Sequence, residues 1–278
     1  MLACAFASHG DTKHVLLLPE DPREAFEFSA LAFDFAERLQ TPVFVMLDLD
    51  IGMNAHLSAP FAWDDSRRYD RGKVLDAEAL DAAQRFGRYL DVDGDGVPYR
   101  TLPGAHPDKG AYFTRGTSRD RFAKYTEESA PYVDNMERLL KKFETARAIL
   151  PAPVERKAAQ RTDMGIIYFG STSAPMEESL DLLAADGRLF DALRVRAFPF
   201  GESVKRFVDS HERVFVVEQN RDAQLRTLLV NDLECDPKKL VKILHFGGAP
   251  INARFIAGAI GRQVGLTARV AKREEAVA

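Results

Sequence analysis

The hydrophobic pattern of the first fifty residues predicts a strand, a helix and a second strand. Residues 14–18 read His-Val-Leu-Leu-Leu, and residues 23–39 carry apolar side chains at helical spacing. After Pro42 comes the run Val-Phe-Val-Met-Leu-Asp-Leu, which is apolar on both faces of an extended chain. This order predicts a βαβ unit with parallel strands in a buried sheet. Since only residues 1–11 precede the unit, the chain is expected to open in the middle of a domain.

The second half of the chain alternates regularly between strand and helix patterns. Strands are predicted at 165–169, 189–198, 214–218 and 241–246. The helices that follow them are predicted at 175–185, 202–211, 222–233 and 252–262. Four such pairs predict a small open α/β domain over residues 163–262, with helices on both faces of its sheet. Residues 263–278 are charged and aperiodic, and they are predicted to form a frayed tail.

The stretch from residue 52 to residue 129 is different, because it is rich in Gly, Pro, Asp, Arg and Tyr. Only residues 76–89 are predicted to be helical there. So long an irregular stretch indicates a functional or interface region. A basic amphipathic helix is predicted at 132–150, and residues 151–162 are predicted to be a linker. The first predicted domain therefore covers residues 1–150.

Composition narrows the class of partner. The 278 residues are 46% hydrophobic and carry a net charge of -4. This weakly acidic balance gives no electrostatic reason to expect nucleic acid or an anionic membrane as a partner. No apolar stretch approaches the roughly 20 residues that span a bilayer, and the apolar residues 1–8 lack the basic flank of a signal peptide. Cys4 and Cys235 lie far apart, which fits a reducing cytoplasm and predicts no metal cluster held by this chain.

The loop at residues 114–121 is the most chemically loaded segment. It reads Thr-Arg-Gly-Thr-Ser-Arg-Asp-Arg, so three arginines stand beside hydroxyl groups, a glycine and an aspartate. Guanidinium groups bind carboxylates and phosphates through two parallel hydrogen bonds. Two interpretations stay open: a ligand-binding loop, or a solvated loop at a subunit interface.

A second candidate is Gly-Ser-Thr-Ser at residues 170–173, between a predicted strand and a predicted helix. Backbone N–H groups and hydroxyls at such a turn can cradle a phosphate. The glycine fingerprint of dinucleotide sites and a phosphate-loop lysine are both absent from the sequence. Ser173 as the helix N-cap, with Glu177 near the first turn, is therefore the favoured interpretation.

Two further candidates follow predicted strands. Residues 218–224 end one strand and open a helix, at the edge where open α/β sheets often bind ligands. A cap by Asn220 or Asp222 is the favoured interpretation there. Asp48 and Asp50 end another strand, and they are predicted to lie in a turn rather than to act as a base or a metal pair.

Residues 91–96 read Asp-Val-Asp-Gly-Asp-Gly and resemble the start of a calcium loop. The twelfth position of that loop is Leu102, where a bidentate Glu is needed, and Pro98 intrudes. An Asp-Gly turn with solvated carboxylates is favoured, although cation binding stays open.

Several long segments together carry a family resemblance that runs from about residue 7 to residue 262. The chain resembles the alpha subunit of 2-oxoacid:ferredoxin oxidoreductases, and within that family the 2-oxoglutarate branch. The resemblance rests on SHGDTKHVLLLPEDPREAFEFSALAFDFAERLQTPVFVMLDLDIGMN, AWDDSRRYDRGKV, FGRYLDVDGDGVPYRT, YFTRGTSRDRFAKYTEE, YVDNMERLLKKFE, IIYFGSTS, ALRVRAFPF and VFVVEQNRDAQLRTLL.

This resemblance implies both a fold and an activity. The fold is the C-terminal part of the domain that binds the pyrimidine ring of thiamine diphosphate, followed by a domain similar to the transketolase C-terminal domain. The activity is oxidative decarboxylation of a 2-oxoacid, with transfer of the acyl group to coenzyme A and of electrons to ferredoxin. In the family the beta subunit supplies the Mg²⁺ and diphosphate site and the iron–sulfur cluster, and a gamma part helps to bind coenzyme A.

The resemblance also implies what this chain lacks. The family's Tyr-Pro-Ile-Thr-Pro-like loop, its pyrimidine-activating Glu, its Pro-Thr-Arg-like segment and the gamma domain do not occur in the sequence. The family's main catalytic residues are therefore expected to correspond to positions upstream of Met1, so that none is expected in this chain.

The chain alone is expected to be inactive and to bind none of these cofactors. Activity is expected only in a complex with the beta subunit, most simply (αβ)₂. An inactive remnant that only binds the beta subunit is the alternative. By resemblance, the loop with Arg115, Gly116, Thr117, Arg119 and Asp120 is expected to contact the substrate or coenzyme A.

Overall fold

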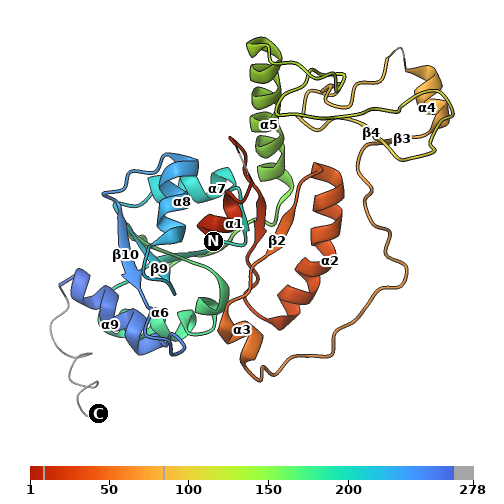
Figure 1. The fold of residues 1–278 in the computed structure, drawn as a ribbon. Coiled ribbons are helices and arrows are strands. Elements are labelled where there is room, and N and C mark those ends of the chain that lie inside the picture. Colours follow the sequence, from red (N-terminus) through yellow and green to blue (C-terminus); the bar gives the residue numbers. More distant parts are fainter. Residues whose placement is uncertain (9, 84, 266–278) are drawn as a thin grey trace.

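Three β-sheets organise the computed structural model, which describes residues 1–8, 10–83 and 85–265 (Figure 1). A three-stranded sheet lies beside a five-stranded one, and a two-stranded sheet lies in an extension that projects away from them. Residues 266–278, most of the predicted tail, are outside the described residues. None of the helices in the described part of the chain is long and apolar enough to cross a membrane.

The predicted βαβ unit is confirmed. Strands β1 (Val15–Leu17) and β2 (Val43–Val45) pair in parallel, and helix α2 (Pro22–Leu39) connects them. The helix begins where the carboxylate of Asp21 accepts a hydrogen bond from the backbone N–H of Glu24 at 2.7 Å, with Pro22 at the first helical position.

A short helix, α1 (Leu2–Ala5), precedes this unit, although the hydrophobic pattern predicted no helix there. Met1 occupies its N-cap position and makes no side-chain capping hydrogen bond. Met1 and Leu2 are partly buried and pack against the apolar cluster that includes residues of the second half of the chain. The backbone N–H of Leu2 also donates to Gln224 Oε1 at 3.1 Å. Met1 is therefore a packing residue at the start of α1.

The predicted strand at 189–198 is two strands in two different sheets, so that prediction was wrong in part. Strand β7 (Asp191–Arg194) pairs with strand β6 (Met164–Tyr168) in the five-stranded sheet. Strand β8 (Ala197–Phe198) leaves that sheet and pairs antiparallel with β1, with Leu16 opposite Phe198. Both strands are fully buried, and no glycine or proline within residues 189–198 marks where the chain changes sheets.

The five-stranded sheet has helices on both faces, as predicted. Its strand order is β10-β9-β6-β7-β5, with β9 at Arg213–Glu218 and β10 at Leu240–Leu244. Helices α6 (Met176–Ala185) and α9 (Ala253–Gln263) share one apolar cluster with this sheet. Helices α7 (Glu202–Asp209) and α8 (Gln224–Leu233) share another cluster on the opposite face. Residues 151–162 were predicted to be a linker, but they include the edge strand β5 (Val154–Arg156), which pairs antiparallel with β7.

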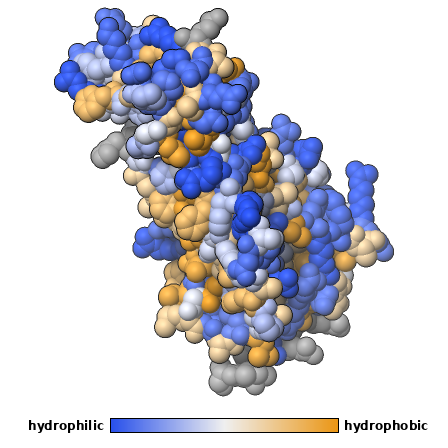
Figure 2. Space-filling view, turned by 90° about the vertical axis from the view of Figure 1, so that its right-hand side faces the viewer, coloured by the Kyte–Doolittle hydropathy of each residue, from blue (hydrophilic) through white to orange (hydrophobic). Residues whose placement is uncertain are grey.

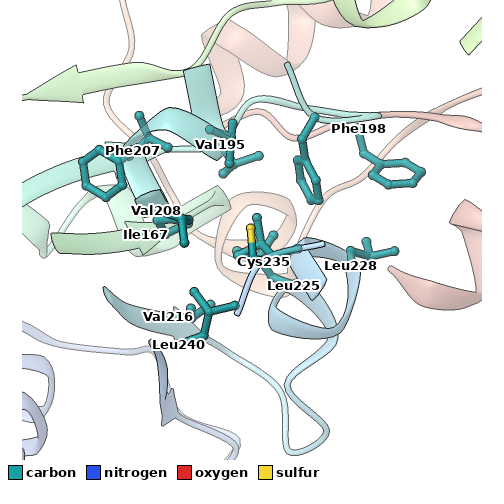
Figure 3. Packing of buried hydrophobic residues seen from close by; sticks show 14 of the residues in the cluster. Ile167, Val195, Phe198, Phe207, Val208, Val216, Leu225, Leu228, Cys235 and Leu240 are labelled. Atoms are coloured by element: carbon teal, nitrogen blue, oxygen red, sulfur yellow. The ribbon is translucent and has the colours of Figure 1, made fainter. Parts of the chain in front are cut away.

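Strand β1 contributes side chains to two cores. Leu16, and Leu18 just after the strand, join the cluster that includes α7 and α8, part of which is shown in Figure 3. Val15 and Leu17 point to the other side and pack with residues of α2 and of helix α5 (Ser129–Ile149). This alternation is the period of two expected of a strand, and it means that the two halves of the chain share a hydrophobic core.

The irregular segment forms the extension beside α5. The extension contains helix α4 (Ala77–Ala82) and the parallel strands β3 (Val74–Leu75) and β4 (Arg100–Thr101). Helix α3 (Leu49–Met53) lies away from the extension, near the opposite end of the molecule (Figure 1). The helix predicted at 76–89 is shorter than expected and ends at Ala82, where the chain continues through Ala83 in an extended conformation. Figure 2 shows that hydrophilic side chains cover much of the upper lobe to which this segment belongs.

Candidate functional site

Asp48 connects the two larger sheets at the end of β2. Its Oδ1 accepts a hydrogen bond from the backbone N–H of Ile51 at 3.0 Å and so caps α3. Its Oδ2 accepts a hydrogen bond from the backbone N–H of Ser171 at 3.0 Å, in the turn that follows β6. Gly170 lies at a φ of 62°, and a Cβ there would come within 2.9 Å of Asp48 Oδ2. Only glycine permits this approach without strain.

The same turn contacts Asp50 and a second predicted strand-end segment, residues 218–224. The hydroxyl of Ser171 lies 3.4 Å from Asp50 Oδ2. The amide of Gln219, just after β9, donates to the Ser171 hydroxyl at 2.7 Å. Three candidates that the sequence presented separately therefore meet in one polar cluster, which we call the strand-end junction: Asp48, Asp50, Ser171, Thr172 and Gln219.

The predicted cap at Ser173 was wrong. Residues 170–173 form a 3₁₀ turn, and α6 begins at Met176 with Pro175 at its N-cap and no side-chain cap. The Ser173 hydroxyl is buried and makes no hydrogen bond to any described residue. Glu177 does lie in the first turn of α6, as expected.

Glu218 and Asn220 together cap the start of α8. The predicted cap by Asn220 is confirmed, since its Oδ1 accepts a hydrogen bond from the backbone N–H of Gln224 at 3.2 Å. The buried carboxylate of Glu218 accepts hydrogen bonds from the backbone N–H groups of Leu225 at 2.7 Å and Arg226 at 3.1 Å, and from the Asn220 amide at 2.8 Å. Burial raises the pKa of Glu218 against these hydrogen bonds. Asp222 pairs with Arg221 at the surface instead of capping α8. The polar groups of this strand end therefore serve the start of a helix.

Removing the Asp48 carboxylate should test how much the strand-end junction stabilises the fold. Asp48→Ala leaves the N–H groups of Ile51 and Ser171 without their acceptor, so we expect the free energy of unfolding to fall by about 1–3 kcal/mol. Urea denaturation followed by circular dichroism measures this change. Asp65→Ala, at an exposed position, is the matched control. Equal midpoints for the two variants would contradict a stabilising junction.

The arginine loop is held by its own polar groups. The carboxylate of Asp120 accepts hydrogen bonds from the backbone N–H groups of Phe122 and Lys124, both at 2.9 Å. The guanidinium of Arg119 donates to the carbonyl oxygen of Gly116 at 2.9 Å and to the hydroxyl of Tyr89 at 3.3 Å. These three side chains and one carbonyl fix the shape of the loop.

Arg115 and Thr117 lie on the outside of that loop and are exposed. The guanidinium of Arg115 sits 5.3 Å from the centre of the Tyr125 ring. Gly116, at a φ of 70°, packs so closely on this ring that a Cβ would lie 2.4 Å from it. Of the predicted contact residues, Arg115 and Thr117 are thus the ones that can reach a ligand without dismantling the loop.

The carboxylates of residues 91–96 already have partners. Asp91 accepts hydrogen bonds from the backbone N–H groups of Gly94 at 2.9 Å and Gly96 at 3.0 Å. The ammonium of Lys73 lies 2.7 Å from both Asp93 and Asp95. No cluster of three or more His, Cys, Asp or Glu side chains is arranged for a metal ion anywhere in residues 1–8, 10–83 and 85–265. A lysine therefore occupies the position relative to these carboxylates that a calcium ion would need.

No protein-family model matches the chain. It is 30% identical over 269 residues to subunit alpha of 2-oxoacid:ferredoxin oxidoreductase 2 from Aeropyrum pernix, covering 94% of this chain and 40% of that protein. It is 25% identical over 225 residues to the 2-oxoglutarate synthase subunit KorA from Methanothermobacter thermautotrophicus, covering 79% of this chain and 56% of that protein.

The fold has a solved counterpart. The structure of 2-oxoglutarate:ferredoxin oxidoreductase from Magnetococcus marinus, with 2-oxoglutarate, coenzyme A and succinyl-CoA bound, superposes with a TM-score of 0.80 at 19% identity. The match covers 95% of this chain and 44% of that chain.

Fold and relatives together define the class: the chain is a homologue of oxidoreductase subunits with a mixed α/β fold. More narrowly, its homologues are alpha subunits of 2-oxoacid:ferredoxin oxidoreductases and 2-oxoglutarate synthase subunits, as the resemblance in the sequence predicted. The chain spans about half the length of these relatives or less.

Proposed function

We propose that this chain is a subunit of a cytoplasmic enzyme complex that oxidatively decarboxylates a 2-oxoacid, with 2-oxoglutarate as the substrate. The products are the acyl-CoA and CO₂, and the electrons pass to ferredoxin. The observation that supports this most strongly is the 30% identity to an alpha subunit across 94% of the chain. The two cysteines, which form no disulfide, agree with a reducing compartment.

The cofactors of the proposed complex are thiamine diphosphate, Mg²⁺ and an iron–sulfur cluster. The thiols of this chain do not fit the cluster, because common clusters need four ligands. Cys235 is buried in the apolar cluster of Figure 3, and burial raises the pKa of its thiol to about 11. We therefore assign the cluster and Mg²⁺ to the beta subunit, and we derive no chemical step through these cofactors from the residues of this chain.

The proposed partner is a beta subunit, and the surface beside α2 and α3 suits one. Large apolar side chains are strongly exposed there, with Phe33 67%, Leu49 75%, Met53 82% and Leu57 104% exposed. Such a run of exposed apolar side chains is typical of a protein–protein contact. We propose further that Arg115 and Thr117, with the loop that Gly116, Arg119 and Asp120 shape, face the substrate or coenzyme A in the assembled complex.

Reconstitution tests this function. The chain is co-purified with a beta subunit of a 2-oxoacid:ferredoxin oxidoreductase, with and without an alpha-subunit segment that carries the motifs absent here. We expect a stable complex by size-exclusion chromatography with light scattering. We also expect viologen reduction that requires 2-oxoglutarate and coenzyme A, and only when that segment is supplied.

Each other outcome is informative. Dye reduction by the chain alone would contradict the assignment of cofactors to its partners. Association without activity in the supplemented complex would favour a remnant that only binds the beta subunit. Faster reduction with pyruvate than with 2-oxoglutarate would reject the proposed substrate.

A further inference from the structure

Three guanidinium groups surround the ring of Tyr89, where the irregular segment meets α5. Arg88 precedes the tyrosine in the chain, Arg119 comes from the arginine loop, and Arg138 comes from α5. Their central carbon atoms lie 5.4, 5.5 and 5.7 Å from the centre of the ring. An aromatic ring attracts one such cation by its negative face, but it does not neutralise three.

Lys142 adds a fourth cation one turn further along α5. Positions i and i+4 share one face of a helix, so Lys142 lies beside Arg138. Its side chain is buried, with only 6% of the residue exposed. Its ammonium lies 5.2 Å from the centre of the Phe143 ring. It makes no hydrogen bond or ion pair with the residues that the structure describes, and its nitrogen is not one of the fully buried atoms without a partner. Desolvation, together with the charges of Arg138 and Arg88, lowers the pKa of Lys142 to about 8.

These cations lack counter-charges among the described residues. No carboxylate lies within ion-pair distance of Arg88, Arg138 or Lys142 in the described part of the chain. Arg138 uses one nitrogen to donate to the carbonyl oxygen of Gly96 at 2.9 Å, while its Nε is buried and has no partner. A buried cation without a partner is unfavourable. A bound anion would therefore stabilise this arrangement by neutralising its charge.

Two of the nearest acidic groups are already engaged. Asp134 binds Arg121 at 2.7 Å, and Asp91 binds the backbone of its own loop at 2.9–3.1 Å. A pocket of about 310 Å³ opens beside Tyr89 and Arg138. Its lining holds these two acids and Glu137 together with the cations Arg121, Arg138 and Lys141.

We propose that Arg88, Arg138 and Lys142 form a binding site for a small polyanion that carries phosphate or carboxylate groups. Arg119 is held by Gly116 and Tyr89, and its guanidinium adds positive charge 5.5 Å from the centre of the same ring. This site goes beyond the function proposed above. Its test uses the chain alone and reads binding rather than activity, so the two proposals can fail separately.

Calorimetric titration of the purified full chain tests the site at pH 7 and constant ionic strength. The probes are inorganic pyrophosphate for phosphate groups and citrate for carboxylate groups, with sodium chloride as the control for screening. We expect one of the two probes to bind at a single site, and the one that binds identifies the ligand chemistry. If neither anion binds to the wild-type chain, the proposal is overturned.

The variants separate this site from general surface charge. Lys142→Met keeps the length of the side chain and removes the charge, so we expect it to weaken binding by about tenfold to a hundredfold. Arg88→Gln, on a half-buried side chain, should act in the same direction. Lys124→Met, in the same segment but exposed, should leave binding unchanged. Equal weakening by Lys124→Met and Lys142→Met would reject the site.

Thermal unfolding gives a second readout, which also holds if one variant folds poorly. Without an anion, Lys142→Met should melt a few degrees higher than the wild type, because it removes an unpaired buried charge. Adding the anion should raise the melting temperature of the wild type and not that of the variant. A variant that is less stable than the wild type and equally stabilised by the anion would contradict the proposal.

The pH dependence of binding gives the third readout. The groups that face Lys142 are Arg138, Arg88 and His14. The arginines stay charged, and burial lowers the pKa of His14 below its usual value, so it is neutral above pH 7. Lys142 must be protonated to bind an anion, so affinity should fall as the pH rises through about 8. The Lys142→Met variant should lose this dependence and Arg88→Gln should keep it, and any other pattern rejects Lys142 as a ligand.

Discussion

Replacing Asp232 with Ala should lower the free energy of unfolding by about 3–5 kcal/mol, as expected when one partner of a buried ion pair is removed. Only 1% of this side chain is exposed. Its carboxylate binds the Arg147 guanidinium at 2.7 and 2.9 Å and the Lys13 ammonium at 2.6 Å. It also accepts a hydrogen bond from the backbone N–H of Phe200 at 3.2 Å. The substitution leaves two partly buried cations and one N–H group without their acceptor.

Equilibrium unfolding in urea, followed by fluorescence and circular dichroism together, measures the loss. Asp222→Ala is the matched control, because it removes an aspartate whose ion pair with Arg221 lies at the surface, and surface pairs contribute little. Arg147→Met in the Asp232→Ala background should recover part of the stability, since it removes the cation left unpaired. A loss for Asp232→Ala no larger than for Asp222→Ala would show that the buried network does not hold α5 to α8.

In a working complex, Arg115→Ala should raise KM for the 2-oxoacid or for coenzyme A by about tenfold to a few hundredfold. This is the range expected when a charge-assisted hydrogen bond to a ligand is lost. Arg119→Ala should raise KM as well, but it also removes the hydrogen bonds to Gly116 and Tyr89 that shape the loop. We therefore expect Arg119→Ala to lower thermal stability, and Arg115→Ala to leave it unchanged.

Arg121 provides the control in the same loop, because its guanidinium is already bound to Asp134. Arg121→Ala should leave both KM values near those of the wild type. Steady-state kinetics on complex isolated by size exclusion keep assembly and ligand binding apart. If Arg115→Ala weakens assembly while the intact complex retains its KM values, the loop is a subunit contact and the ligand role is rejected.

The sequence predicted most elements because their burial follows a simple period. Helix α2 and strands β1 and β2 are examples, as are the four strand–helix pairs of the second half. It could not predict that residues 189–198 divide between two sheets, since β7 and β8 are both fully buried and no turn residue separates them. The edge strand β5 was missed because its three residues are exposed and show no buried face.

The strand-end junction shows a second limit. Asp48, Ser171 and Gln219 were each singled out because each follows a strand. That they meet depends on which strands are neighbours across two sheets, and local sequence does not contain that information. The cap at Ser173 failed for a related reason, because the 3₁₀ turn delays the start of α6 to Met176. The charge of Lys142 was visible as part of a basic helix, but its burial without a counter-charge is a tertiary property.

Strand β8 has a consequence for synthesis on the ribosome. The three-stranded sheet pairs Leu16 with Phe198 and Leu17 with Ala197, so its third strand is translated long after the first two. The edge of β1 that pairs with β8 therefore stays unpaired until β8 has been translated. Pairings so distant in sequence form slowly, and unpaired edges invite association with other chains. The nascent chain therefore passes through a stage in which a chaperone that shields strand edges would improve its yield.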